Sequence, residues 1–290
     1  MRELVIISGK GGAGKTSIAA AVAAAMTHAV IADCDVDAAD LHLLLPPEET
    51  AEEVFFSGWE PVVADTCMGC GRCTQWCRFA AITVQSGRAV VDRLTCEGCG
   101  VCSDHCPAGA VTLRERRCGK LFVSRTVYGT LVHARLDAGG ENSGKLVSAV
   151  RKRARELAEA QKARFIIVDG PPGTGCPVIA SLAGADAALL VAEPSVSSMH
   201  DIERVIRLCR HFQVPAWGCI NKSDVHPGVA EKVKNLFEAH RVGLLGTLGY
   251  NRAFVDAQLE RKPVTVLSEQ AREEINTLVK ELFHDGKKDR

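Results

Sequence analysis

One short segment restricts the fold of this chain more than any other. Residues 9–16, with the sequence GKGGAGKT, fit the pattern G-x-x-x-x-G-K-[ST]. An apolar run at residues 4–8 precedes the segment, and an alanine-rich run at residues 17–26 follows it. Small residues allow backbone N–H groups to close around an anion, and the first turn of a helix adds partial positive charge. The segment therefore predicts a phosphate-binding loop between a buried strand and a helix.

This loop supplies most of the residues expected to bind a nucleotide. The Lys15 ammonium is expected to pair with the β- and γ-phosphates, and the Thr16 hydroxyl is expected to bind Mg²⁺. The complete set predicted in the loop is Gly9, Lys10, Gly11, Gly12, Ala13, Gly14, Lys15, Thr16 and Ser17.

The remainder of the chain alternates predicted strands with predicted helices. Short apolar runs without polar alternation are expected of strands that are buried on both faces. These runs are residues 29–32, 165–169, 187–192 and 216–220. Helical patterns lie at residues 145–160, 198–211 and 229–240. This order predicts an α/β fold of three layers with a mostly parallel sheet.

One block of the chain does not follow this alternation. Residues 58–117 are rich in Cys and Gly and show no long helical period. We predict that they form a small inserted α+β domain, and that residues 1–57 and 118–290 together form the phosphate-loop domain.

Charge and composition argue against several classes of function. The 290 residues include 35 basic and 35 acidic side chains, so bulk charge favours neither nucleic acid nor an anionic membrane. Aromatic residues make up only 5%, which disfavours a base-stacking surface. No apolar run reaches the roughly 18 residues that a membrane helix needs. The N-terminus enters a predicted strand directly, so we expect no signal peptide and a cytoplasmic protein.

The cysteines are the most unusual part of the composition. Thirteen are present, and the pattern C-x-x-C-x-x-C-x-x-x-C occurs twice, at residues 67–77 and 96–106. A reducing compartment does not favour clustered disulfides, so metal binding is the better interpretation. The spacing is that of bacterial two-cluster ferredoxins, in which the fourth cysteine of each motif is carried to the other cluster.

The ferredoxin spacing fixes two predicted ligand sets. One [4Fe-4S] cluster is expected on Cys67, Cys70, Cys73 and Cys106. The second is expected on Cys96, Cys99, Cys102 and Cys77. Zinc held by four cysteines is the alternative.

Three further segments are similar to one family of phosphate-loop ATPases. Residues 32–37 (ADCDVD), 167–173 (IVDGPPG) and 221–224 (NKSD) lie at the ends of apolar strands, and Lys10 adds a second lysine to the loop. Together they resemble the deviant Walker A ATPases of the MinD, ParA and nitrogenase-iron-protein group. The chain as a whole resembles such an ATPase with an inserted ferredoxin domain.

The resemblance implies a role for each residue that matches the family motifs. Lys10 would reach the phosphates of a partner subunit in a nucleotide-sandwich dimer. Asp35 would orient or activate the attacking water, and Asp169 would hold the Mg²⁺ shell through water. Asn221 would contact the base, with ATP favoured and GTP left open. The expected catalytic residues are Lys10, Lys15, Asp35 and Asp169.

Other residues leave alternatives open. Asp33 and Asp37 either take part in the first switch or simply cap and solvate its loop. Cys176 is either an inert thiol of the second switch or, as in the nitrogenase iron protein, a ligand of a cluster between subunits. The nearest further thiol for such a cluster is Cys118. A helix at residues 268–283 combines one apolar face with acidic residues, so we expect it to pack on the sheet and not on a membrane.

The leading functional hypothesis is electron transfer gated by ATP. Nucleotide-dependent homodimerisation and switch movement would change how two clusters meet a redox partner protein or a metallocofactor. The first alternative is a positioning ATPase of the cell-division or partition type, with structural or redox-sensing clusters. The second is an iron–sulfur or metallocofactor assembly ATPase, which is disfavoured because no C-terminal C-x-x-C is present.

Overall fold

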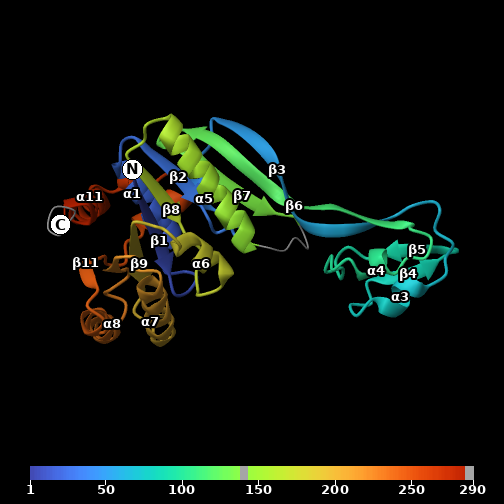
Figure 1. Ribbon diagram of the computed structural model, residues 1–290. Coiled ribbons are helices and arrows are strands. Elements are labelled where there is room, and N and C mark those ends of the chain that lie inside the picture. The colour runs from blue at the N-terminus through green and yellow to red at the C-terminus, as the bar shows by residue number, and fades with distance from the viewer. Residues whose placement is uncertain (138–142, 285–290) are drawn as a thin grey trace. The chain divides into compact units, whose positions relative to one another are not determined.

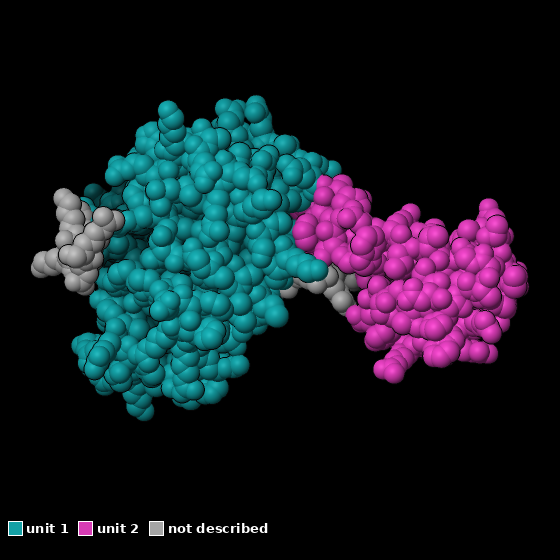
Figure 2. All heavy atoms as spheres, viewed as in Figure 1, with its two compact units in different colours: residues 1–53, 121–135, 143–290 teal, residues 54–120, 136–142 magenta. Residues whose placement is uncertain are grey.

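The structure is a computed structural model, and it describes residues 1–137 and 143–284. The chain forms two compact units, shown in teal and magenta in Figure 2. Unit 1 comprises residues 1–53, 121–135 and 143–290, and unit 2 comprises residues 54–120 and 136–142. The chain passes from unit 1 into unit 2 within strand β3 (Glu49–Val63) and returns within strand β6 (Val111–Thr126).

A nine-stranded sheet has the order β11-β10-β9-β1-β8-β2-β7-β6-β3. Besides β3 and β6, its strands are β1 (Arg2–Ser8), β2 (Ala29–Asp33), β7 (Gly129–Leu136), β8 (Phe165–Asp169), β9 (Ala187–Ala192), β10 (Ala216–Ile220) and β11 (Gly243–Thr247). Neighbours from β11 through β7 in this order pair in parallel. Because β6 and β7 are adjacent and joined by two residues, they form a hairpin. The prediction of a mostly parallel sheet is confirmed.

The central strands are buried along their whole length. In β1, Leu4 is 1% exposed, and Val5, Ile6 and Ile7 are fully buried. A parallel strand between two layers of helices buries both of its faces, which explains why these runs lack polar alternation.

Helices cover both faces of the sheet, and this gives the three predicted layers (Figure 1). One layer contains α5 (Ser143–Ala160), α6 (Cys176–Leu182), α7 (Val196–His211) and α8 (Pro227–Ala239). The other contains α1 (Lys15–Ala25), α9 (Ala253–Leu259), α10 (Val264–Leu267) and α11 (Glu269–His284), and the short α2 (Leu41–Leu44) packs on α1. Right-handed crossovers between parallel strands produce this distribution.

The last helix packs on the sheet layer as predicted. Ile275, Leu278 and Leu282 of α11 are buried, and the helix contacts α1 and β11. No helix within residues 1–137 and 143–284 is both long enough and apolar enough to span a bilayer.

Unit 2 contains the duplicated cysteine motifs. Each motif includes a short helix, α3 (Arg72–Trp76) and α4 (Val101–Asp104). Gly71 and Gly100 precede these helices with φ of 71° and 82°, a conformation that glycine adopts most easily. A small antiparallel sheet is formed by β4 (Ile82–Gln85) and β5 (Arg88–Val91). The buried residues of its core are Cys73, Ile82, Ala89, Cys102 and Val111.

A buried ion pair links β1 to α5. Glu3 is 4% exposed, and its two carboxylate oxygens lie 2.6 Å from Arg151 Nε and 2.6 Å from Arg155 NH2. Arg151 is 5% exposed and also donates to the carbonyls of Ala180 and Ala183. Since these contacts satisfy charges that are otherwise cut off from water, the strand and the helix are held in one arrangement.

We predict that Glu3→Ala lowers the free energy of unfolding by about 3–5 kcal/mol, because it leaves a buried guanidinium without its carboxylate. The matched control is Glu156→Ala, which removes a 48% exposed carboxylate from α5 and is expected to cost less than about 1 kcal/mol. Urea denaturation followed by circular dichroism measures both changes. Equal losses in the two variants would contradict the prediction.

Candidate functional site

The phosphate loop joins the end of β1 to the start of α1. Gly12 and Gly14 have φ of 85° and 88°, in the left-handed region where other residues are strained. A Cβ atom on Gly9 would lie 2.6 Å from the backbone carbonyl carbon of Asp201 and 2.6 Å from the backbone nitrogen of Ile202, both in α7. Glycine is therefore required by conformation at positions 12 and 14 and by space at position 9.

The Lys15 side chain points at carboxylates that follow neighbouring strands. Its Nζ lies 2.9 Å from Asp169 Oδ1 at the end of β8 and 3.4 Å from Asp35 Oδ2 just after β2. It also donates to Thr16 Oγ1 at 3.2 Å. Burial lowers the pKa of Lys15, but attraction to Asp169 and Asp35 outweighs burial and the net shift is upward. The structure thus brings three predicted site residues, Thr16, Asp35 and Asp169, together around the Lys15 ammonium.

Asp33 organises the loop that follows β2. Its Oδ1 accepts a hydrogen bond from the Asp35 backbone N–H at 3.1 Å, and its Oδ2 accepts one from Leu41 N–H at 3.0 Å. Burial, and then repulsion from Asp169, raise the pKa of Asp33 well above its usual range. Capping of the loop, one of the two predicted alternatives for Asp33, is what the structure shows.

One carboxylate oxygen of Asp169 has no hydrogen-bond partner among the described residues. Its Oδ1 accepts from Lys15, whereas its buried Oδ2 has no hydrogen-bond partner in the part of the chain that the structure describes. An isolated buried oxygen of a carboxylate is costly unless a donor such as water reaches it. This oxygen fits the predicted contact with the water shell of Mg²⁺.

Asn221 contacts the phosphate loop through its side chain. Its Nδ2 donates to the carbonyl of Ala13 at 2.9 Å, and its Oδ1 accepts from Lys222 N–H at 3.0 Å. A Cβ atom on Gly14 would collide with the same amide group. Through these contacts the Asn221 side chain stabilises the phosphate loop. The predicted contact of Asn221 with a nucleotide base stays a prediction.

Lys10 lies at the open side of the loop and is 46% exposed. Its Nζ donates to Ser197 Oγ at 3.3 Å and lies 3.7 Å from Glu193 Oε1. The other carboxylate oxygen of Glu193 lies 3.7 Å from Nζ of Lys222, which also donates to the Gly12 carbonyl at 2.9 Å. Glu193 thus joins two lysines of the loop region.

Glu193 is not among the predicted site residues, because it belongs to none of the sequence motifs. One signal could have found it. Glu193 directly follows β9, which pairs in parallel with β1, so it lies at the same edge of the sheet as the loop.

The eight clustered cysteines surround two hollows in unit 2. One hollow is lined by Cys67, Cys70, Cys73 and Cys106, together with Gly69 and Gly71. The other is lined by Cys77, Cys96, Cys99 and Cys102, together with Gly98 and Gly100. Each hollow thus receives three cysteines from one motif and the fourth cysteine from the other.

Backbone N–H groups point at several of these sulfurs. Ala81 N–H donates to Cys77 Sγ at 3.3 Å, and Ala110 N–H donates to Cys106 Sγ at 3.3 Å, at equivalent places in the two motifs. Hydrogen bonds from Ala89 and Gly69 lower the pKa of Cys67. Such donors favour the thiolate, which is the form that binds metal.

The described residues form no site for a single metal ion. Within residues 1–137 and 143–284, no three His, Cys, Asp or Glu side chains converge on a point that one metal ion would occupy.

The other cysteines lie outside the two hollows. Cys209 and Cys219 are buried, and burial raises the pKa of each thiol to about 12, as expected of core residues. Cys118 is buried in unit 2 and donates to the Ser57 carbonyl. Cys176 is exposed at the first turn of α6 in unit 1. Its predicted alternatives remain open.

Known proteins resemble this chain in sequence and in fold. It is 36% identical over 217 residues to the uncharacterized protein MJ0578 of Methanocaldococcus jannaschii, covering 73% of this chain and 75% of that protein. The cell division ATPase MinD of Pyrococcus furiosus matches with a TM-score of 0.60 and 17% identity, over 98% of this chain and 99% of that one. The septum site-determining protein MinD of Pyrococcus horikoshii, complexed with Mg-ADP, matches with a TM-score of 0.60 and 16% identity, over 100% and 99%. At these identities the solved structures show the fold alone.

The sequence also matches the model of one protein family over most of its length. Residues 4–264 match the CobQ/CobB/MinD/ParA nucleotide binding domain. This match confirms the MinD/ParA part of the predicted family, and the deviant Walker A loop and the inserted ferredoxin domain stay predictions. The chain therefore belongs to the CobQ/CobB/MinD/ParA family of nucleotide-binding domains.

Proposed function

We propose that this chain is a Mg²⁺-dependent ATPase of the MinD/ParA type that dimerises when ATP binds. The observation that carries the proposal is the Lys15 ammonium, which lies within 3.4 Å of both Asp35 and Asp169 at the mouth of the phosphate loop. Family membership and the likeness to a MinD complexed with Mg-ADP support it.

The contacts of Lys15 explain how nucleotide binding acts on the switches. A triphosphate competes with Asp35 and Asp169 for the Lys15 ammonium, because all three are anionic partners of one cation. Asp35, once released, orients the attacking water, and Thr16 Oγ1 turns to Mg²⁺. Asp169 Oδ2, which has no hydrogen-bond partner within residues 1–137 and 143–284, would hold the water shell of Mg²⁺. ATP is the proposed nucleotide, by analogy with the family.

Lys10 is assigned to the partner subunit of a homodimer. Its side chain is 46% exposed and is held by Ser197 and Glu193, outside the ring of residues around Lys15. From there it meets the phosphates of the partner, where it stabilises the negative charge that develops during phosphoryl transfer.

Unit 2 is proposed to hold two [4Fe-4S] clusters. Each thiolate of such a cluster binds a different iron, so the ligands surround a space and do not meet at one ion. Two observations support this assignment: the four cysteines around each hollow, and the backbone N–H groups aimed at Cys77 and Cys106. When bound, the clusters supply one-electron transfer. In the proposal, Cys106 and Cys77 are the crossed ligands that tie the two motifs together.

The role of the clusters separates the leading hypothesis from its alternatives. The comparisons support a MinD/ParA ATPase better than they support electron transfer, because the family match is to MinD/ParA and the similar solved structures include MinD and a ParA family ATPase. In the positioning alternative, the clusters are structural or sense redox state. We retain ATP-gated electron transfer to a redox partner as the finer proposal, because one chain combines a phosphate-sensing switch with two ferredoxin motifs. Assembly of iron–sulfur clusters or metallocofactors is the third hypothesis, and we place it below the other two.

A test of gating uses anaerobically reduced protein and the dianionic acceptor anthraquinone-2,6-disulfonate. We expect Mg-ATP to change the stopped-flow oxidation rate several-fold in the parent, and to leave it unchanged in Lys15→Ala, which lacks the phosphate-binding ammonium. If the oxidation rate of the parent protein is the same with and without Mg-ATP, the gating hypothesis is wrong and the positioning alternative is favoured.

Metal analysis tests the cluster assignment. Protein prepared without oxygen is expected to contain about eight irons and eight sulfides per chain, since each ligand set holds one [4Fe-4S] cluster. Two equivalents of zinc with negligible iron would instead favour the four-cysteine zinc alternative.

Two cysteine variants test whether the fourth ligands cross over. Cys70→Ser is expected to damage mainly the first cluster, and Cys77→Ser mainly the second, although both residues belong to the first motif. Electron paramagnetic resonance of the reduced variants distinguishes the two losses. Damage to the same cluster in both variants rules out the crossed arrangement.

Variants of the two loop lysines test the dimer role of Lys10. We expect Lys10→Ala to retain most ATP affinity but to lose ATP-dependent dimerisation and most hydrolysis, because its charge serves the partner's phosphates. Sedimentation with Mg-ATP measures dimerisation. Lys15→Ala is the control that loses binding, and Asp35→Ala is the control that binds without hydrolysing. If Lys10→Ala dimerises and turns over like the parent, the deviant Walker A assignment is wrong.

A further inference from the structure

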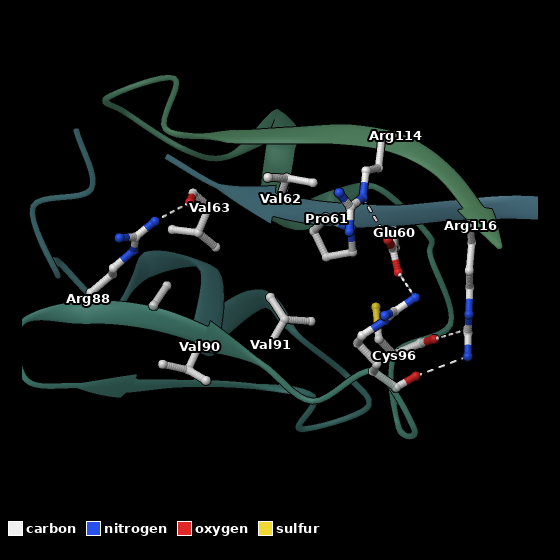
Figure 3. Close-up of a pocket in the computed structure, with 12 residues that line it drawn as sticks. Glu60, Pro61, Val62, Val63, Arg88, Val90, Val91, Cys96, Arg114 and Arg116 are labelled. Atoms are coloured by element: carbon white, nitrogen blue, oxygen red, sulfur yellow. Dashed lines mark hydrogen bonds and ion pairs between the residues drawn. The ribbon is translucent and has the colours of Figure 1, made fainter. Parts of the chain in front are cut away.

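A groove of about 310 Å³ lies in unit 2, beside the second cysteine hollow (Figure 3). Figure 3 shows it between the end of β3 and strand β5, with residues of β6 at one side. Its apolar lining comes from Pro61, Val62 and Val63 of β3 and from Val90 and Val91 of β5. The volume is at the lower limit of small-molecule pockets, and the groove is open to solvent.

The charged residues of the groove are mostly cations. Its lining includes the four arginines Arg88, Arg93, Arg114 and Arg116 but only one carboxylate, that of Glu60. The chain as a whole has equal numbers of basic and acidic side chains, so this excess is local and is not a consequence of composition. A concave surface of one sign attracts ligands of the other sign.

Glu60 fixes two of these arginines in place. Its side chain is 8% exposed, and its two oxygens lie 2.6 Å from Arg114 Nε and 2.7 Å from Arg93 NH2. The arginine side chains are nevertheless 60% and 64% exposed, for Arg93 and Arg114 respectively. One buried carboxylate thus holds two guanidinium groups that keep much of their surface open to an incoming anion, for which arginine offers paired donors.

The groove adjoins the second cysteine set. Cys96 lines both the groove and the hollow with Cys77, Cys99 and Cys102, and Pro61 also lines both. The Cys96 carbonyl accepts a hydrogen bond from Arg116 at 2.9 Å, as drawn in Figure 3. A group bound in the groove would therefore lie against a residue that we assign to the second cluster.

We infer that this groove is the docking site for a carboxylate-bearing segment of the redox partner protein. The inference rests on the proposed cluster function, and charge complementarity selects the acidic partner. Arginine next to an apolar floor is also typical of protein interfaces. Docking there brings the partner to the second cluster, and a reduced cluster then gives one electron to the oxidised acceptor that the partner carries.

Binding of a labelled peptide tests the groove without using the clusters. The probe alternates Glu and Leu over eight residues, and a Lys–Leu peptide is its control. We expect fluorescence anisotropy to show that the parent binds the Glu peptide at low salt. The affinity for this peptide is expected to be about threefold lower in Arg93→Gln and in Arg114→Gln. Each single variant leaves Glu60 one arginine partner, so the unit retains its fold. Iron content unchanged from the parent verifies this.

Arg117→Gln is the matched control, since Arg117 lies on β6 in unit 2, is 46% exposed and pairs with Asp137 outside the groove. It is expected to bind the peptide like the parent. The inference is overturned if the parent does not bind the Glu peptide, or if Arg93→Gln and Arg114→Gln bind it as tightly as Arg117→Gln.

Stopped-flow oxidation tests the link between the groove and electron exchange. Arg93→Gln and Arg114→Gln are expected to lower the rate at which the reduced protein transfers electrons to the dianion anthraquinone-2,6-disulfonate severalfold. The rate with the trication hexaammineruthenium(III) is expected to stay unchanged. Equal slowing of both acceptors, or of neither, overturns the docking role. If the protein contains no iron but the Glu peptide binds as expected, the cluster proposal fails while the groove remains an acidic-segment site.

Discussion

The arrangement of unit 1 depends on an ion pair at the carboxyl ends of its central strands. The parallel register sets Asp33 at the end of β2 beside Asp169 at the end of β8, so two carboxylates meet in a buried place. Their repulsion helps to raise the pKa of Asp33, and the Lys15 ammonium offsets it by pairing with Asp169 at 2.9 Å. Because α1 begins at Lys15, this pair also ties the first helix to the sheet.

The sequence predicted the centre of the fold well for a physical reason. Residues 165–169, 187–192 and 216–220 were predicted as strands and have those bounds in the structure, because burial on both faces demands an uninterrupted apolar run. The long strands β3 and β6 were not predicted. Their residues are of mixed polarity and mixed burial and give neither a continuous apolar run nor a strict alternation, so local pattern does not identify these strands.

Site residues that belong to a sequence motif could be predicted from the sequence. Site residues that only the fold brings together could not. Lys15, Asp35 and Asp169 belong to motifs, and the structure places them within one set of contacts. Glu193 and the arginine groove belong to no motif. They exist because the parallel register brings the end of β9 beside the loop, and because segments far apart in the chain, at Glu60 and Arg114, face one another.

Both lysines of the phosphate loop pair with carboxylates near the ends of strands. Each is matched in the structure by carboxylates that follow strands: Lys15 by Asp35 and Asp169, and Lys10 by Glu193. In the proposed function, a phosphate that binds either lysine would compete with these carboxylates. Asp169 is the last residue of β8, and Asp35 and Glu193 lie in the loops that follow β2 and β9. In the proposed dimer, the chain's own nucleotide would act on Asp35 and Asp169, and the partner's nucleotide would act on Glu193, so contacts at the ends of β2, β8 and β9 would respond to nucleotide. That linkage gives a small ligand control over a large part of the surface.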